Sequence, residues 1–177
     1  MKILITGNMG YIGPTVVRQL RESHPEAILV GVDMGYFASC LTASDALPEC
    51  QLDAQYFCDV RKVSPSMVTG VDVVVYLAAI SNDPMGATFE GITFDVNHHA
   101  AFRLATNAKK AGAKAFVFAS SCSVYGFAEG GPRREEDSIN PLTAYAKSKV
   151  SAERDLAQIA DKTFQVTCLR FATACGM

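Results

Sequence analysis

The chain has 177 residues, 49% of them hydrophobic, which is enough for one domain with a substantial buried core. Its formal net charge of −2 and pI of about 5.9 argue against a surface built for nucleic acid or an anionic membrane. Each apolar segment is shorter than the roughly 20 residues of a membrane span, and the first residues lack the layout of a signal peptide. We therefore expect a cytoplasmic globular protein.

Six cysteines are scattered along the chain without a CxxC pair. Three of them, Cys58, Cys122 and Cys168, lie in or beside apolar segments, so we expect buried thiols rather than disulfides. The three histidines show no metal-ligand spacing with a cysteine or acidic cluster. The sequence therefore predicts no metal site.

Short apolar segments alternate with amphipathic stretches along the chain. We predict strands at 2–6, 28–33, 55–58, 72–79, 115–120 and 165–171. We predict helices at 12–23, 93–111 and 143–160, and irregular stretches at 34–54 and 123–142. This alternation indicates an α/β fold with a doubly wound parallel sheet, forming one domain over residues 1–177.

A glycine-rich turn follows the first predicted strand. Gly7 allows the tight turn, Gly10 lets the backbone approach a pyrophosphate, and Gly13 lets helix and strand pack closely. Tyr11 and Ile12 lie where the helix begins, and the N–H groups there would face the anion. Glycine spacing alone is a weak signal, because glycines also close ordinary loops. The flanking strand and helix make a dinucleotide site the better interpretation.

Two acidic residues follow predicted strands. Asp33 ends the second strand, where its carboxylate would accept hydrogen bonds from the adenosine ribose and repel a 2′-phosphate. Residues 34–38 contain no lysine or arginine to bind that phosphate, which favours NAD over NADP. Asp59 and Val60 follow the third strand, where an acceptor and an apolar contact could hold the adenine. For both aspartates, the alternative interpretation is a residue that caps a turn.

Small residues end the fourth predicted strand at Leu77, Ala78 and Ala79, as suits a backbone that passes close to a cofactor. Asn97 lies in the predicted helix 93–111 and, taken alone, would be a polar residue on the helix face. The segment 81–85 could contact substrate hydroxyls or form an ordinary turn.

Tyr145 and Lys149 are four residues apart, which places them on one face of the predicted helix 143–160. A tyrosine, with a pKa of about 10, becomes a useful base only where positive charge stabilises its phenolate. The lysine ammonium and a nicotinamide ring would supply that charge. Serine hydroxyls at 120, 121 and 123 follow the fifth strand, where an open α/β sheet binds ligands.

Together these motifs resemble the extended short-chain dehydrogenase/reductases of the NAD-dependent sugar-nucleotide epimerase/dehydratase family, which have a Rossmann fold. The matching residues, in chain order, are the glycines at 7–13, Asp33, Asp59-Val60, Leu77-Ala78-Ala79, Asn97, Ser120 to Gly126, and Pro141 with Tyr145, Ser148 and Lys149. The resemblance implies Tyr145 as the base, Lys149 as its tuner and a ribose ligand, Ser121 as the residue that orients the reacting oxygen, and Asn97 as a helix residue that shapes the site.

The departures from the family pattern bear on the reaction. Cys122 and Ser123 replace the Asp-Glu pair that family dehydratases use for water elimination, which favours epimerisation, oxidation or reduction over 4,6-dehydration. Tyr76 stands where the family usually has histidine, and Thr173 replaces an asparagine that often touches the substrate diphosphate.

Family members continue beyond the sixth strand into a smaller domain that holds the nucleotide-sugar. This chain ends at Met177, so we expect a truncated form with NAD binding and weak or no turnover. A nucleotide-sugar is the implied substrate, and the resemblance implies a homodimer through the helices at 93–111 and 143–160. The alternatives are a non-catalytic NAD-binding or scaffold protein of the same fold and a 4,6-dehydratase.

Overall fold

The computed structural model describes residues 1–37, 48–81, 88–127 and 130–175. Six parallel strands form one sheet in the order β3-β2-β1-β4-β5-β6. Their bounds are β1 Lys2–Thr6, β2 Ile28–Asp33, β3 Ala54–Phe57, β4 Val73–Tyr76, β5 Ala115–Ser121 and β6 Gln165–Phe171. Strand order reverses at β1, so the crevice between the ends of β1 and β4 is the expected ligand site of such a sheet. The predicted doubly wound α/β fold is confirmed.

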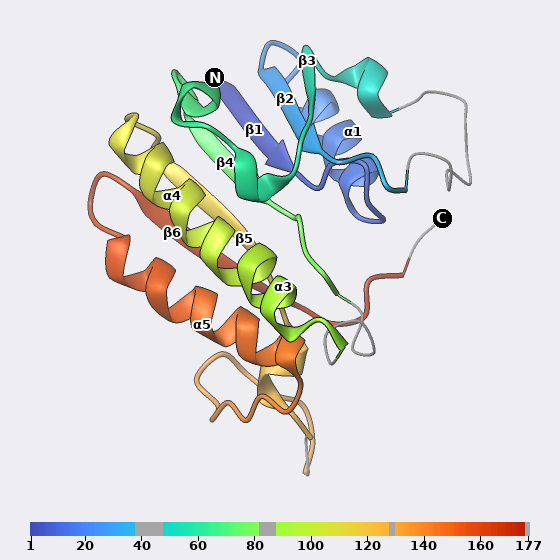
Figure 1. The fold of residues 1–177 in the computed structure, drawn as a ribbon, viewed down its shortest axis with the longest axis vertical. Coiled ribbons are helices and arrows are strands. Elements are labelled where there is room, and N and C mark those ends of the chain that lie inside the picture. Colours follow the sequence, from blue (N-terminus) through green and yellow to red (C-terminus); the bar gives the residue numbers. More distant parts are fainter. Residues whose placement is uncertain (38–47, 82–87, 128–129, 176–177) are drawn as a thin grey trace.

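Helices cover both faces of this sheet (Figure 1). The helix α1, Gly13–Ser23, lies on one face, while α3, Glu90–Phe94, α4, Ala101–Lys110, and α5, Ala144–Ile159, lie on the other. Short 3-10 turns span Pro48–Gln51, Val60–Lys62, Pro65–Val68 and Cys122–Tyr125. The structure places no helix long and apolar enough to cross a membrane in the ranges that it describes.

Alternation along the strands divides the buried core into two layers. Leu4, Val74 and Phe116 belong to the cluster that α4 and α5 cover, whereas Ile3 and Ile5 belong to the cluster that α1 covers. Adjacent residues of a strand point to opposite faces, so β1, β2 and β4 supply both clusters. Continuous apolar runs such as Ile3 to Ile5 are therefore explained by burial on both sides.

The predicted helix 93–111 begins earlier and is interrupted. Between α3 and α4 the chain forms a π-helical segment, η4, Asp95–Ala100. The Tyr76 hydroxyl donates a 2.6 Å hydrogen bond to the Val96 carbonyl in this segment. Tyr76 is completely buried, and its burial raises the pKa of the phenol. It therefore attaches the π-helical segment to β4 as a neutral donor.

Two predictions need correction. The strand predicted at 72–79 ends at Tyr76, because its neighbour β1 ends at Thr6 and turns away at Gly7. The expectation of buried thiols is wrong for Cys122, which is exposed because the chain leaves the sheet after Ser121 and enters a 3-10 turn. Cys58 and Cys168 are half-buried. The five cysteines in the described ranges are unpaired thiols, and Cys40 lies outside those ranges.

Candidate functional site

The glycine loop has the geometry of a backbone built for close approach. Gly7 has a φ of +73°, and a Cβ atom placed on it would lie 2.6 Å from the Ala78 nitrogen. A Cβ on Gly13 would lie 2.3 Å from the Asn8 carbonyl oxygen, so a side chain there would separate the helix from the loop. At Gly10 the nearest such atom is the Gly7 carbonyl oxygen, at 3.3 Å. The loop thus fits tightly against the segment after β4 and the start of α1, and a side chain at Gly10 would crowd the Gly7 carbonyl.

Asp33 fixes this loop from the end of β2. Its carboxylate accepts hydrogen bonds from the Met9 N–H, at 3.0 Å, and the Gly35 N–H, at 2.8 Å. Asp33 therefore caps a turn, as the alternative interpretation held, and also ties that turn to the glycine loop. Both bonds hold the carboxylate beside the loop, where a ribose role would require it.

Asp59 is held by its neighbour Arg61. The guanidinium donates to both carboxylate oxygens, the closest contact being 2.5 Å from Nη2 to Oδ2, and the Arg61 N–H donates to Oδ1 at 2.8 Å. These bonds lower the pKa of Asp59. Asp59 thus caps the turn that contains the buried Val60, and an adenine amine would have to share its carboxylate with Arg61.

A chain of contacts runs from the glycine loop to α5. Ala78 lies against Gly7, and the next residue, Ala79, is exposed. The Ile80 N–H donates to the Asn97 side chain at 2.8 Å, and the Ile80 carbonyl accepts from it at 3.0 Å. The fully buried Asn97 also donates to the Ser148 hydroxyl at 3.1 Å. Ser148 in turn donates to the Tyr145 carbonyl at 2.7 Å. Asn97 thus lies where it fixes the segment after Leu77 relative to the helix of Tyr145.

Lys149 lies beneath the reactive face of α5. Its side chain is almost fully buried, and its Nζ donates to the Ala119 carbonyl of β5 at 2.7 Å. The same Nζ lies 5.6 Å from the centre of the Tyr145 ring and 4.6 Å from that of Phe118. Burial lowers the pKa of Lys149 to about 7. The predicted Tyr-Lys pair therefore meets at the carboxyl end of β5, with Tyr145 half-exposed above it.

Ser121 is the last residue of β5, two residues beyond the carbonyl that binds Lys149. Its Oγ accepts bonds from the Ser123 hydroxyl, at 2.7 Å, and the Ser123 N–H, at 3.2 Å. Since Ser123 supplies the hydrogen in the hydroxyl pair, the Ser121 O–H remains a donor for a further oxygen. Ser123 thus has a local role in orienting Ser121.

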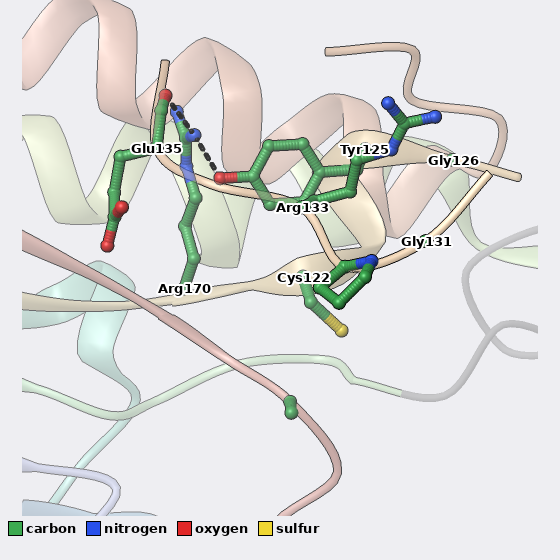
Figure 2. A pocket seen from close by; sticks show the side chains of 9 residues that line it. Cys122, Tyr125, Gly126, Gly131, Arg133, Glu135 and Arg170 are labelled. Carbon is green, nitrogen blue, oxygen red and sulfur yellow. Dashed lines mark hydrogen bonds between the residues drawn. The ribbon is translucent and has the colours of Figure 1, made fainter. Parts of the chain in front are cut away.

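Beside Ser121 lies a pocket of about 410 Å³ (Figure 2). Cys122, Arg133 and Ala172 are among its lining residues. Figure 2 shows Arg170 at one side of it, with bonds to the Tyr125 hydroxyl at 2.7 Å and to the Glu135 carbonyl at 3.2 Å. Arg170 therefore attaches the pocket loop to β6.

Comparison with known proteins places this site in a family. Residues 3–177 match the model of the NAD dependent epimerase/dehydratase family. The chain belongs to that family. It is 29% identical to the uncharacterized UDP-glucose epimerase YtcB of Bacillus subtilis over 99% of the chain, and 29% identical to the dTDP-glucose 4,6-dehydratase of Streptomyces griseus over 85%. The structure of MoeE5 in complex with UDP-glucose and NAD is 30% identical, with a TM-score of 0.79 over 96% of the chain.

This epimerase/dehydratase-family chain spans about half the length of the relatives it matches. It covers 57% of YtcB, 47% of the dehydratase and 54% of MoeE5. The family is NAD-dependent, as the sequence motifs predicted. Among the residues that the structure describes, no group of three or more His, Cys, Asp or Glu side chains is arranged to hold a metal.

Sequence reasoning missed three residues that build the site. The buried Asn8 donates to the Gln55 side chain at 2.6 Å and fills the space above Gly31, so it anchors the glycine loop to β3. Glu153 and Arg170 form an ion pair of 2.7 Å between α5 and β6. The sequence signal for Glu153 was its place four residues after Lys149 on the same helix face. Of the segment 81–85, residues 82–85 lie outside the described ranges.

Proposed function

We propose that the chain is the NAD-binding and catalytic half, over residues 1–177, of a nucleotide-sugar epimerase or dehydrogenase. The observation that carries this proposal is the contact of Lys149 with both the end of β5 and the ring of Tyr145. This contact supports Tyr145 as the base and Lys149 as its tuning cation, at the carboxyl end of β5, where Ser121 also lies and where such folds bind ligands.

The cofactor residues support NAD as the occupant of the crevice. A helix start behind a glycine loop binds a pyrophosphate through backbone N–H groups, and Gly10 has no side chain to obstruct that approach. Asp33, held beside the loop, would accept hydrogen bonds from the ribose hydroxyls and repel a 2′-phosphate. Tyr11 is exposed and Ile12 half-exposed at this surface, as their predicted place beside the cofactor requires.

The chemistry follows from the groups around Tyr145. Bound NAD supplies the hydride acceptor. Tyr145, as phenolate, takes the hydroxyl proton of a sugar carbon while that carbon loses its hydride, which leaves a ketone. Ser121 donates to the reacting oxygen, and Lys149 stabilises the phenolate and holds the ribose. With NAD bound, the same site would allow an epimerase to reduce the ketone again from its opposite face, or a dehydrogenase to release it.

The substrate class comes from the relatives, whose names specify UDP-glucose and dTDP-glucose. We favour epimerisation or oxidation over 4,6-dehydration, because Cys122 and Ser123 provide no carboxylate beside Ser121, and Ser123 is bonded to Ser121 itself. A homodimer through the helices around 93–111 and 143–160 is part of the proposal, since α4 and α5 lie side by side on one face (Figure 1).

The decisive test of this function is Tyr145→Phe, which removes one hydroxyl and keeps the ring. UDP- and dTDP-sugars are incubated with NAD and the protein, and NMR follows the sugar carbons. We expect any conversion by the parent to fall by about 100-fold or more in the variant. The affinity for NAD should change little. A variant that converts the sugar at the parent rate would exclude Tyr145 as the base.

A further inference from the structure

Glu153 lies one helical turn beyond Lys149, and Tyr145, Lys149 and Glu153 repeat at intervals of four along α5. The reaction proposed above uses the first two and leaves the third without a role. Glu153 is not a surface carboxylate, since its side chain is only 12% exposed. A carboxylate this deeply placed requires partners, and the structure gives it two from neighbouring strands.

The partners of Glu153 are adjacent in the sheet. Ser120 of β5 donates its hydroxyl to Glu153 Oε1, and Arg170 of β6 donates from Nε and Nη2, the closest contact being 2.7 Å. Ser120 and Arg170 are register partners across the two strands. Glu153 therefore lies over a defined pair at the end of the sheet and forms an ion pair with Arg170.

Two successive turns of α5 are thereby joined to successive residues of β5. Lys149 binds the Ala119 carbonyl, Glu153 binds the Ser120 hydroxyl, and Ser121 follows directly. The groups that face Lys149 are Tyr145 and Glu153 on its own helix, the Ala119 carbonyl and Phe118 ring on β5, and Cys168 on β6. Burial raises the pKa of the Cys168 thiol to about 11, so this thiol is neutral and Glu153 is the anion that balances the lysine.

We propose that Glu153 is a positioning residue that acts through Lys149, keeping the buried lysine charged and directed toward Tyr145. The inference rests on the proposed function for its purpose, and on the Ser120–Glu153–Arg170 contacts for its geometry. Arg170 extends the arrangement to the pocket loop, because the same guanidinium binds the Tyr125 hydroxyl and the Glu135 carbonyl (Figure 2). Glu153 of α5 is thus connected, through Arg170, to residues that line the pocket.

The electrostatic consequence has a definite sign. Burial lowers the pKa of Lys149 to about 7, and the Glu153 carboxylate opposes that lowering. Glu153→Gln removes the anion, keeps the shape, and leaves the Arg170 charge uncompensated. The pKa of Lys149 must then fall further. A substitution that only loosened the packing would admit water and raise this pKa toward its ordinary value of 10.5.

The experiment is an NMR titration of the ¹³Cε resonances of lysine-labelled protein, with Lys149 assigned by its loss in Lys149→Arg. We expect the midpoint near 7 in the parent and lower by about one unit in Glu153→Gln. Glu26→Gln, a loss of the same charge on the exposed turn before β2, should leave the midpoint unchanged. An unchanged or raised midpoint in Glu153→Gln would overturn the proposal.

Two additions keep the result independent of folding and of the proposed function. If Glu153→Gln does not fold, Arg170→Gln makes the same test with the opposite sign, because it removes a cation that screens Glu153. The midpoint of Lys149 should then rise, and a fall or no change would overturn the proposal. The titration needs no cofactor or sugar. Failure of NAD to bind would therefore count against the proposed function and leave the lysine result standing.

Discussion

Lys149 shows how one buried residue can serve structure and chemistry together. Its ammonium is removed from water, which lowers its pKa, yet it keeps a backbone carbonyl as acceptor and two aromatic rings as neighbours. A lysine with a pKa near neutrality can take part in proton transfer with a phenol at working pH more readily than an exposed lysine can. The burial of Lys149 and its place beside the Tyr145 ring therefore support the two residues as a pair that acts together.

Gly7 gives the sharpest prediction at this scale. Gly7→Ala introduces a methyl group at a φ of +73° and against the Ala78 backbone. We expect it to lower the free energy of unfolding by about 2 to 4 kcal/mol, measured by urea denaturation. Gly112→Ala is the matched control, because Gly112 has a φ of +90° but open space around it, and should cost about 1 kcal/mol. Equal losses would show that backbone strain alone, and not the close approach of Ala78, requires glycine at position 7.

At the scale of elements, the connection between β4 and α5 depends on Asn97. Its side chain holds both backbone groups of Ile80 and the Ser148 hydroxyl from a fully buried position. This position lies in the π-helical segment, which Tyr76 also attaches to β4. An interruption of a helix at a functional site is a common use of π-helical turns.

Asn97→Ala removes this connection. We expect a loss of about 2 to 4 kcal/mol in the free energy of unfolding, because buried polar groups lose their partners. Hydrogen exchange of the Ile80 amide should accelerate well beyond that of the β1 amides. Asn107→Ala, on the half-buried side of α4, is the control and should leave Ile80 protected. If Ile80 exchanges at the parent rate in Asn97→Ala, Asn97 does not fix this segment.

Periodicity predicted the helices and most of the strands because these elements bury an apolar face, whereas β3 is largely exposed. The helix predicted at 143–160 agrees with α5 to within one residue. The end of β4 was missed, since it depends on where the neighbouring strand β1 stops. The motifs predicted the positions of Tyr145, Lys149 and Ser121. The Ser120–Glu153–Arg170 contacts could not be predicted, because they join residues far apart in the sequence through strand register.

In the whole molecule, the glycine loop and the reactive residues lie at the carboxyl ends of the strands. They are connected through Ala78, Ile80 and Asn97. The same chain covers about half the length of its relatives. The proposed NAD site lies within residues 1–177, so NAD binding is the part of the proposed function that can be tested on this chain alone.

Calorimetric titration of NAD and of NADP into the 177-residue chain, with Asp33→Ala as the variant, measures whether residues 1–177 form an NAD site. We predict that NAD binds, that NADP binds at least about tenfold more weakly because its 2′-phosphate meets Asp33, and that Asp33→Ala weakens NAD binding. Equal affinity for the two cofactors in the parent, or NAD binding unchanged in Asp33→Ala, would contradict the account of the cofactor site. Failure of the parent to bind NAD would contradict the proposal that this chain is a working cofactor domain.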